Sequence, residues 1–276
     1  MDSKQKLVEL NVRQKAYYES KAGAASGRNP AGNLATFLWA RLRQSIQRSE
    51  RGVGVGAAIA DTHRAWLGDL SDKDVLDLGC YSGNRLSVEI AQSAKSYLGL
   101  DLSAKAIEKL RGKLEGIPGA EAKTADFLAE DYCERFDVIY ACSVLHHFSD
   151  FDVLCAELHK ALRPGGVVIS IDPLQSDPLI RLARWLYRPF QSDKDWEWPF
   201  DRRNFATIRR YFAIEAVQGF RGLSKLGFLA GPWGGPIARW GNGVDLRQAN
   251  RFGLPLALCW MVALKFSKPR QGGADS

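Results

Sequence analysis

Two glycines and an acid stand at the spacing of a nucleoside-binding turn. The stretch VLDLGCYSGNR places Gly79 and Gly83 after an apolar run, and Asp101 follows Gly79 by 22 residues. In a βαβ unit, glycines in the first turn let ligand atoms approach the backbone closely. An acid about 20 residues later accepts hydrogen bonds from a ribose diol. This spacing therefore predicts a ribose site.

The same turn argues against a diphosphate ligand. A dinucleotide fingerprint G-x-G-x-x-G that starts at Gly79 would need glycines where Tyr81 and Asn84 stand. The close path from a diphosphate to the helix N-terminus is then missing, and the sequence has no G-x-x-x-x-G-K-[ST] loop. The predicted ligand carries a ribose whose 5′ substituent is not a diphosphate.

Two adjacent histidines are the candidates for proton transfer. His146 and His147 follow the apolar run FDVIYACSVL. Imidazole exchanges protons near neutral pH, so either residue could act as the general base for a hydroxyl group. Alternatively, LHHF is a packing and turn element with one ring bonded to the backbone. His63 and His159 lie in helical patterns and are expected to be surface or packing residues.

No metal site is expected from the sequence. It contains no H-E-x-x-H motif and no C-x-x-C pair among its five cysteines, which read as free thiols of a reducing cytoplasm. The carboxylates of Asp172 and Asp177 lack an obvious third partner. Metal-dependent chemistry is therefore disfavoured.

Short apolar runs alternate with amphipathic segments between residues 73 and 172, which is typical of a parallel sheet built from βαβ units. The helices are expected at Asn84–Ala94, after an N-cap at Ser103, and after an N-cap at Ser149 or Asp150. The expected strands are Asp74–Leu78, Tyr97–Leu100, a run ending near Thr124, Phe136–Ala141 and Val167–Ile171, the last launched by the turn RPGG.

The order of these motifs resembles the class I S-adenosylmethionine-dependent methyltransferases over about residues 73–172. VLDLGCYSGNRL matches the glycine motif of that family, LGLDLSAKAIEKL its ribose-acid strand and TADF its adenine-side acid. FDVIYACSVLHHF and LRPGGVVISIDP match its fourth and fifth strands. The resemblance implies an α/β fold, a Rossmann-like seven-stranded, mostly parallel sheet with helices on both faces, and S-adenosyl-L-methionine as cofactor.

The resemblance also implies which residues meet the cofactor. Asp77 and Gly79 are expected at the methionine end, and Tyr81, where the family usually has glycine, narrows the turn or packs beside it. Asp101 is expected to accept from the ribose and Asp126 from the adenine amino group. Four further residues are expected at the cofactor: Leu102 and Phe127 beside the base, and Ala141 and Ser143 near the sulfonium. Gly83, in the glycine turn, is the last expected cofactor-binding residue.

The flanking sequence predicts an extension, two insertions and a tail. Residues 1–70 read as an N-terminal helical extension or lid, residues 71–268 as the methyltransferase domain, and residues 269–276 as a flexible tail. The runs Ile214–Phe220 and Leu258–Phe266 fit a closing antiparallel pair of strands, and Leu254–Phe266 reads as a buried strand. Insertions at about 174–210 and 221–255 mix Trp with Arg, which favours a lid over a large, partly apolar acceptor.

The formal net charge of +7 leaves three interpretations open. The helix-like stretch TFLWARLRQSIQRSER (residues 36–51) is a solvated helix with its apolar face in the lid, or it touches a membrane surface. RNA binding comes third, because acidic residues interrupt the arginine-rich stretch near residue 200. A charged N-terminus without a cleavable apolar segment favours the cytoplasm, with possible contact to the inner face of a membrane.

These observations predict an enzyme that methylates a small or amphipathic acceptor, at the oxygen of a lipid, isoprenoid, glycan or secondary metabolite. CSVLHHF stands where enzymes that methylate amino groups commonly have (N/D)PP(Y/F), which counts against nitrogen. The alternatives are an RNA or protein methyltransferase and a non-catalytic scaffold that keeps the fold. The oligomeric state stays open.

Overall fold

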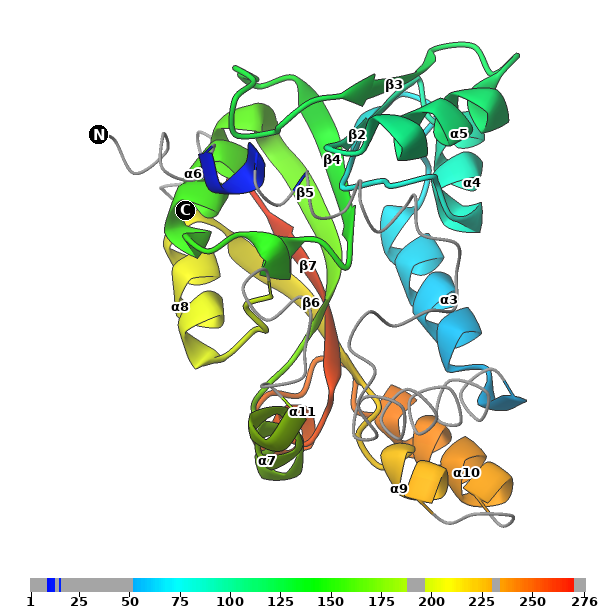
Figure 1. The fold of residues 1–276 in the computed structure, drawn as a ribbon, viewed down its shortest axis with the longest axis vertical. Coiled ribbons are helices and arrows are strands. Elements are labelled where there is room, and N and C mark those ends of the chain that lie inside the picture. Colours follow the sequence, from blue (N-terminus) through cyan, green and yellow to red (C-terminus); the bar gives the residue numbers. More distant parts are fainter. Residues whose placement is uncertain (1–8, 13–14, 16–51, 188–196, 230–233, 271–276) are drawn as a thin grey trace, which may run out of the picture.

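A computed structural model describes residues 9–12, 15, 52–187, 197–229 and 234–270. Seven strands form one sheet in the order β3-β2-β1-β4-β5-β7-β6 (Figure 1). Only β7 runs antiparallel to its neighbours, so the expected mostly parallel sheet and its closing antiparallel pair are confirmed. The strands are β1 Asp74–Leu78, β2 Ser96–Asp101, β3 Ala120–Thr124, β4 Phe136–Cys142, β5 Leu162–Pro173, β6 Ala213–Phe220 and β7 Met261–Ser267.

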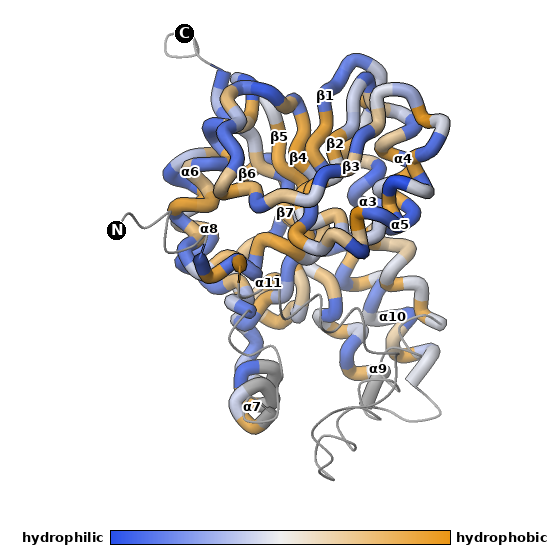
Figure 2. Tube along the Cα trace, turned by 45° about the horizontal axis from the view of Figure 1, so that its top comes forward, coloured by the Kyte–Doolittle hydropathy of each residue, from blue (hydrophilic) through white to orange (hydrophobic). Residues whose placement is uncertain are grey.

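Helices cover both faces of this sheet. Apolar side chains of α6 and α8 pack into the core on one face, and those of α4 and α5 pack into the core on the other. The strands between them form the apolar centre of the molecule (Figure 2). The helices are α3 Val55–Leu67, α4 Arg85–Ser93, α5 Ala104–Leu114, α6 Phe151–Ala161, α7 Pro178–Tyr187, α8 Arg202–Tyr211, α9 Lys225–Leu229, α10 Gly234–Leu246 and α11 Leu254–Ala257.

The helices that flank the first strands begin at side-chain caps. The side chain of Asn84 accepts from the backbone N–H of Ser87, and the backbone N–H of Asn84 donates to Oγ of Ser87, so Asn84 precedes α4 and is not its first residue. Ser103 caps α5 as expected, and Asp150 rather than Ser149 caps α6. Because each cap follows the carboxyl end of a strand, the turns that follow β1 and β2 are fixed at both ends.

Two predicted boundaries were wrong. β5 begins at Leu162, which pairs with Phe136, so the turn RPGG is part of the strand rather than its launch. The stretch predicted as one buried strand from Leu254 to Phe266 divides into α11 and β7, and Leu254 is 73% exposed. Pro255 lies in the first turn of α11, where its missing N–H costs no helical hydrogen bond.

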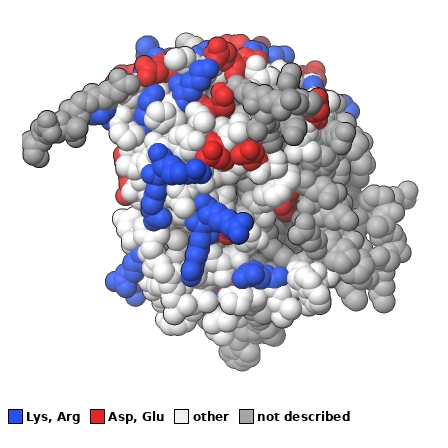
Figure 3. Space-filling view, turned by 90° about the vertical axis from the view of Figure 1, so that its left-hand side faces the viewer, with Lys and Arg blue, Asp and Glu red and all other residues white. Residues whose placement is uncertain are grey.

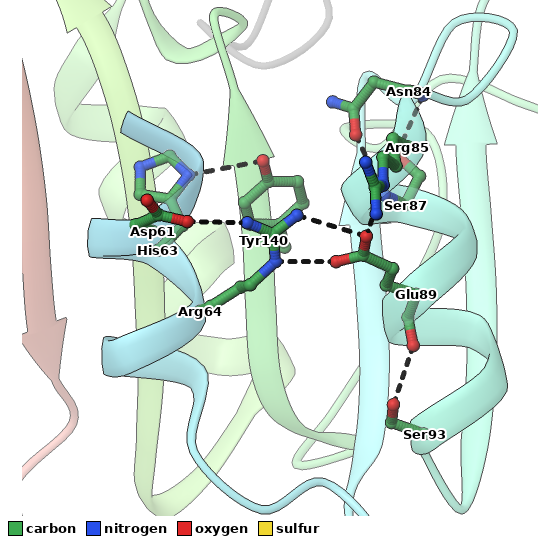
Figure 4. Close-up of polar contacts among 9 residues, drawn as sticks. All are labelled: Asp61, His63, Arg64, Asn84, Arg85, Ser87, Glu89, Ser93 and Tyr140. Atoms are coloured by element: carbon green, nitrogen blue, oxygen red, sulfur yellow. Dashed lines mark hydrogen bonds and ion pairs between the residues drawn. The ribbon is translucent and has the colours of Figure 1, made fainter. Parts of the chain in front are cut away.

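Helix α3 is docked on the sheet by polar contacts (Figure 4). Nδ1 of the buried His63 lies 3.3 Å from the hydroxyl of Tyr140 in β4. Arg64 binds both carboxylate oxygens of Glu89 in α4, at 2.7 and 3.1 Å, and the carboxylate of Asp61. His63 is therefore a packing residue, as expected. The remaining stretch of interest in the extension, residues 36–51, and the end of the tail, residues 271–276, lie outside the described residues.

Candidate functional site

A cavity of about 250 Å³ opens where β1, β2 and β4 end. Strand order reverses between β1 and β4, and such a switch point is where doubly wound sheets bind ligands. Its lining residues are Asn11, Leu78, Gly79, Tyr81, Leu100, Asp101, Leu102, Ser103, Ala125, Asp126, Phe127, Cys142, Ser143, Val144, His147 and Phe148.

The turn after β1 lines this cavity, and its backbone enters the left-handed region of φ and ψ. Gly79 has φ +66°, and a Cβ there would meet Val144 Cγ2 at 2.3 Å, so both conformation and space require glycine. Tyr81 has φ +48° and Ser143 has φ +58°, values that side chains rarely adopt. Such strained backbone gathers at functional sites, where the surrounding structure holds it. The side chain of Tyr81 is 51% exposed at the cavity mouth.

The carboxylate of Asp101 joins the two sides of the turn. One oxygen accepts from the backbone N–H of Tyr81 at 2.9 Å and the other from that of Ser103 at 2.8 Å. Each carboxylate oxygen can accept a second hydrogen bond, so the fixed group can still bind two hydroxyls. Burial raises the pKa of Asp101. The backbone bonds oppose that rise and hold the carboxylate toward the cavity.

Asp126 is held on the far side of the cavity. It accepts from the backbone N–H of Leu128 at 3.0 Å, and both of its oxygens lie 2.9–3.0 Å from Nδ2 of Asn11. The amide of Asn11 presents an –NH₂ group to this carboxylate, which is the type of donor that adenine also carries. Asn11 could not be identified from the sequence, because it lies 115 residues away from Asp126.

Three of the expected cofactor residues do not line the cavity. Asp77 is buried in the sheet, where its carboxylate accepts from the hydroxyl of Tyr97 at 2.7 Å and burial raises its pKa to about 6. Ala141 is fully buried among the core residues. Gly83 faces α5, since a Cβ there would meet Leu110 Cδ1 at 2.6 Å. These residues support the turn and strands from behind, whereas the other seven expected residues line the cavity.

The two histidines have different surroundings. His147 lines the cavity. His146 is buried, and both its backbone N–H, at 3.1 Å, and its Nδ1, at 2.8 Å, lie against one oxygen of the fully buried Asp172. The rings of His146 and His147 have their centroids 4.1 Å apart. Asp172, the residue before the last of β5, thus fixes His146; in the sequence it was considered only as a metal ligand.

The segment just before α8 contacts the histidine turn. The backbone N–H of Trp198 donates to the carbonyl of His146 at 2.7 Å, and Leu174 bridges to Phe200 next to it. Among the described residues, no group of three or more His, Cys, Asp or Glu side chains is placed to hold a metal ion.

The chain is similar to several known proteins. It is 27% identical over 168 residues to an uncharacterized methyltransferase of Synechocystis, covering 52% of this chain and 74% of that protein. It is 36% identical over 97 residues to the ubiquinone biosynthesis O-methyltransferase of Rhizobium etli, covering 34% of this chain and only 38% of that protein. A solved S-adenosylmethionine-dependent methyltransferase from Mesorhizobium loti shares the fold, with a TM-score of 0.51, 22% identity, and coverage of 74% of this chain and 95% of that one.

The family described as methyltransferase domain matches residues 50–216, which is more than half of the chain. This range holds β1 to β5, the glycine turn, both acids of the cavity and the histidine pair. The chain therefore belongs to the methyltransferase-domain family and is an S-adenosylmethionine-dependent methyltransferase.

Proposed function

We propose that the cavity between Asp101 and Asp126 is the cofactor site of this enzyme. Asp101 would accept from the two ribose hydroxyls, and Asp126 would accept from the adenine amino group in place of the Asn11 amide. Leu102 and Phe127 supply apolar contact for the base. The observation that carries this assignment is the placement of Asp101: backbone N–H groups fix both of its carboxylate oxygens, and the residue lines the cavity.

The bound cofactor supplies an electrophilic methyl group. The protein's part is to orient the acceptor and to remove its proton. We assign the proton-accepting role to His147, because it is the histidine that lines the cavity. Asp172 fixes His146 through Nδ1, and the ring of His146 in turn packs against His147, so both are positioning residues.

The proposed reaction is O-methylation of a small or amphipathic acceptor: a lipid, isoprenoid, glycan or secondary metabolite. It is supported by the CSVLHHF sequence at the end of β4, which has histidines where enzymes that methylate amino groups commonly have (N/D)PP(Y/F). The name of the Rhizobium etli relative also points to an oxygen acceptor. Among the described residues no helix is long and apolar enough to cross a bilayer. We place the enzyme in the cytoplasm, in peripheral contact with the inner face of a membrane.

Binding of S-adenosylhomocysteine, measured by titration calorimetry, tests the cofactor site. The Asp101→Asn variant keeps the shape of the side chain but loses the charge that two hydroxyls would share. Asparagine keeps one acceptor oxygen, so the variant should lose one charge-assisted bond, which contributes about 1.5–3 kcal/mol, and the affinity should fall by about 10- to 100-fold. Asp72→Asn, at an exposed position before β1, is the matched control and should bind like the wild type. Equal binding by Asp101→Asn would refute the assignment.

Transfer of labelled methyl groups to lipid, small-molecule and RNA extracts tests the acceptor class. Label in the lipid or small-molecule fraction supports the proposal, and label confined to RNA contradicts it. With an acceptor in hand, His147→Gln should lower kcat by about 100-fold or more. Asp172→Asn should lower kcat less and shift the pH profile, because it changes only how His146 is held. If His147→Gln left kcat unchanged, the proton would not go to this residue.

A further inference from the structure

Helix α7 exposes a face of large apolar side chains. Leu182 is 53% exposed, Trp185 71% and Leu186 58%. Their spacing of i, i+3 and i+4 puts them on one side of the helix. Arg181, one turn before Trp185, is exposed beside them. A contiguous exposed patch of this kind marks a surface that contacts something apolar.

Helix α7 lies at the edge of the sheet where the parallel strands end, which is the edge where the cofactor cavity opens. α7 begins five residues after β5 ends, and the ends of β5 and β6 lie level, since Pro173 and Phe220 both pair with Met261. Figures 1 and 2 both place α7, α9 and α10 at the same end of the molecule. On α10, Trp240 is 62% and Ile237 38% exposed. Exposed tryptophans therefore recur at the end to which the parallel strands point.

Arginines adjoin the apolar face of α7. A surface hollow of about 450 Å³ is lined by Arg181, Arg202 and Arg203 together with Gln175, Ser176, Asp201 and Ala257. No ion pair joins any of these three guanidinium groups to another residue in the part of the chain that the structure describes. Guanidinium groups bind phosphate oxygens with two parallel hydrogen bonds. The hollow thus offers unpaired donors of the type that phosphates need.

The basic character extends along α8. Its exposed arginines are Arg202, Arg203, Arg209 and Arg210, of which Arg210 is paired with Asp152. Figure 3, which views the molecule from the side that carries α6 and α8 in Figure 1, shows Lys and Arg side chains gathered across the middle of that face. The positive surface thus continues away from the apolar side chains of α7 instead of being confined to one hollow.

We infer that Arg181, Leu182, Trp185, Leu186, Arg202 and Arg203 form a docking surface for an anionic lipid bilayer. Leucine and tryptophan side chains enter the interface between headgroups and acyl chains, and the arginines bind lipid phosphates. Charge complementarity selects this occupant, because the surface pairs unneutralised arginines with apolar side chains and the chain carries a net charge of +7. The inference rests on the proposed function in one respect: an amphipathic acceptor would reach the cavity from the membrane on which the enzyme sits.

Co-sedimentation with vesicles tests the docking surface. The full chain should bind vesicles of phosphatidylglycerol and phosphatidylcholine in equal parts, and should bind pure phosphatidylcholine vesicles at least about tenfold more weakly. Binding to the anionic vesicles should weaken as salt is raised from 50 to 500 mM, because screening reduces the attraction of exposed charges. If the full chain did not sediment with anionic vesicles, the inference would be wrong.

Two variants separate the apolar from the charged part. Trp185→Ala with Leu186→Ala keeps good helix formers at exposed positions. Arg202→Glu with Arg203→Glu puts acids in the first turn of α8, where they suit the helix dipole and should not unfold it. Each pair should weaken vesicle binding by about tenfold or more. Lys95→Glu is the control and should bind like the wild type. Lys95 is exposed and directly precedes β2, so it lies at the amino ends of the parallel strands, opposite to the end that carries α7. Wild-type binding by both double variants would overturn the inference.

Two further measurements identify other occupants and separate this inference from the proposed function. A dimer in size-exclusion chromatography with light scattering that the Trp185→Ala, Leu186→Ala variant abolishes would mean that the face binds a second copy, which overturns the membrane assignment. Each docking variant should still bind S-adenosylhomocysteine with wild-type affinity. Vesicle binding by a wild type that does not bind S-adenosylhomocysteine would instead refute the cofactor site and leave the docking surface standing.

Discussion

Single residues decide the shape of the cofactor turn. Gly79 and Tyr81 both sit at positive φ, but only Gly79 also lacks room for a side chain. Tyr81 keeps its conformation because its N–H is fixed by Asp101 and its side chain extends to solvent. The acid that we propose to bind the ribose thus also holds the backbone of this turn. Loss of either glycine or acid should affect folding and binding together.

The first prediction concerns Gly79→Ala. A left-handed alanine costs about 1–2 kcal/mol, and the contact with Val144 adds to it, so the free energy of unfolding should fall by about 2 kcal/mol or more. Gly112→Ala is the matched control. No atom lies within 4 Å of a Cβ there, and the α-helical backbone favours alanine by about 0.5–1 kcal/mol. Urea unfolding measures both; a Gly79→Ala protein as stable as the wild type would contradict the strained geometry.

Much of the site was predictable where chemistry follows local spacing. Asp101 and Gly79 are identified by their distance along the chain within one βαβ unit, and His147 by its place after β4. Asn11 and Asp172 were not identified as site residues, since each acts through a partner that is distant in sequence. The burial of Asp77 was also missed, because a ligand acid and a buried structural acid look alike in the motif. The role of these residues depends on which distant residues they contact, and residue type alone does not reveal those contacts.

At the scale of elements, α3 is attached to the sheet through a buried imidazole. Burial lowers the pKa of His63 to about 4, from 6.5 in the unfolded chain. Unfolding therefore takes up a proton between those two values. The contribution of His63 to the free energy of unfolding is fully present above pH 6.5 and is lost as the pH falls toward 4. Acid should loosen the docking of α3 first.

The second prediction compares the wild type with His63→Gln, which can still bond to Tyr140. Between pH 7 and pH 4.5 the wild type should lose about 2 kcal/mol of unfolding free energy relative to the variant. The comparison with a variant is needed because Asp77, whose pKa burial raises to about 6, acts in the opposite direction over the same range. Urea titrations at the two pH values measure the difference. Parallel pH profiles would show that His63 is not the group that titrates.

A second element-scale feature is the turn between β6 and α9. The buried carboxylate of Asp245 in α10 accepts from the backbone N–H groups of Gly222, Leu223 and Ser224 and from the hydroxyl of Ser224. One side chain thus ties α10 to the turn that leads into α9. Lys225, next in the chain, pairs with the buried Asp177 just before α7. These contacts hold the second insertion against the sheet.

The third prediction is that Asp245→Ala destabilises this part of the molecule by about 3 kcal/mol or more, because it leaves several buried donors without an acceptor. Asp245→Asn keeps one acceptor oxygen and should cost less. Limited proteolysis should cut the alanine variant between residues 221 and 253 before the rest of the chain, and urea unfolding gives the energy. A protease pattern identical to that of the wild type would argue against this role.

Element boundaries were less predictable than element types. Apolar runs identified β1, β2 and β4, because burial on both faces leaves a strong pattern. The start of β5 was missed because Leu162 pairs with Phe136 ahead of an irregularity at residues 163–166, whose proline and glycines usually mark a turn. The division between α11 and β7 was missed because LPLALCWMVALKF is apolar throughout, so the period of two that marks a strand is hidden.

At the scale of the whole molecule, the cysteines differ in how far they are exposed to solvent. All five described cysteines are free thiols; Cys133 is exposed, Cys142 is partly buried, and the other three are buried. Burial raises the pKa of Cys142 to about 11 and those of Cys155 and Cys259 to about 12. Because the thiolate is the reactive form, only Cys133 should react readily in the folded protein.

The fourth prediction follows for titration with Ellman's reagent. The folded protein should release about one equivalent of thionitrobenzoate quickly, and the unfolded protein all five, which counts the free thiols in the chain. Cys133→Ser should abolish the fast phase. Slow reaction of Cys142, which lines the cavity, should be slower still in the presence of S-adenosylhomocysteine. Several fast equivalents from the folded protein would contradict the burial of these side chains.

Strand β7 has a further consequence for how the protein is made. It inserts between β5 and β6, yet it is the last strand to leave the ribosome. Until then β5 has one open edge and β6 has no partner in the sheet, and exposed strand edges invite pairing with other chains. Asp172 lies on that open edge, paired with Val262 in the finished protein. The edge of β5 that carries Asp172 therefore stays open to pairing with other chains until β7 has joined the sheet.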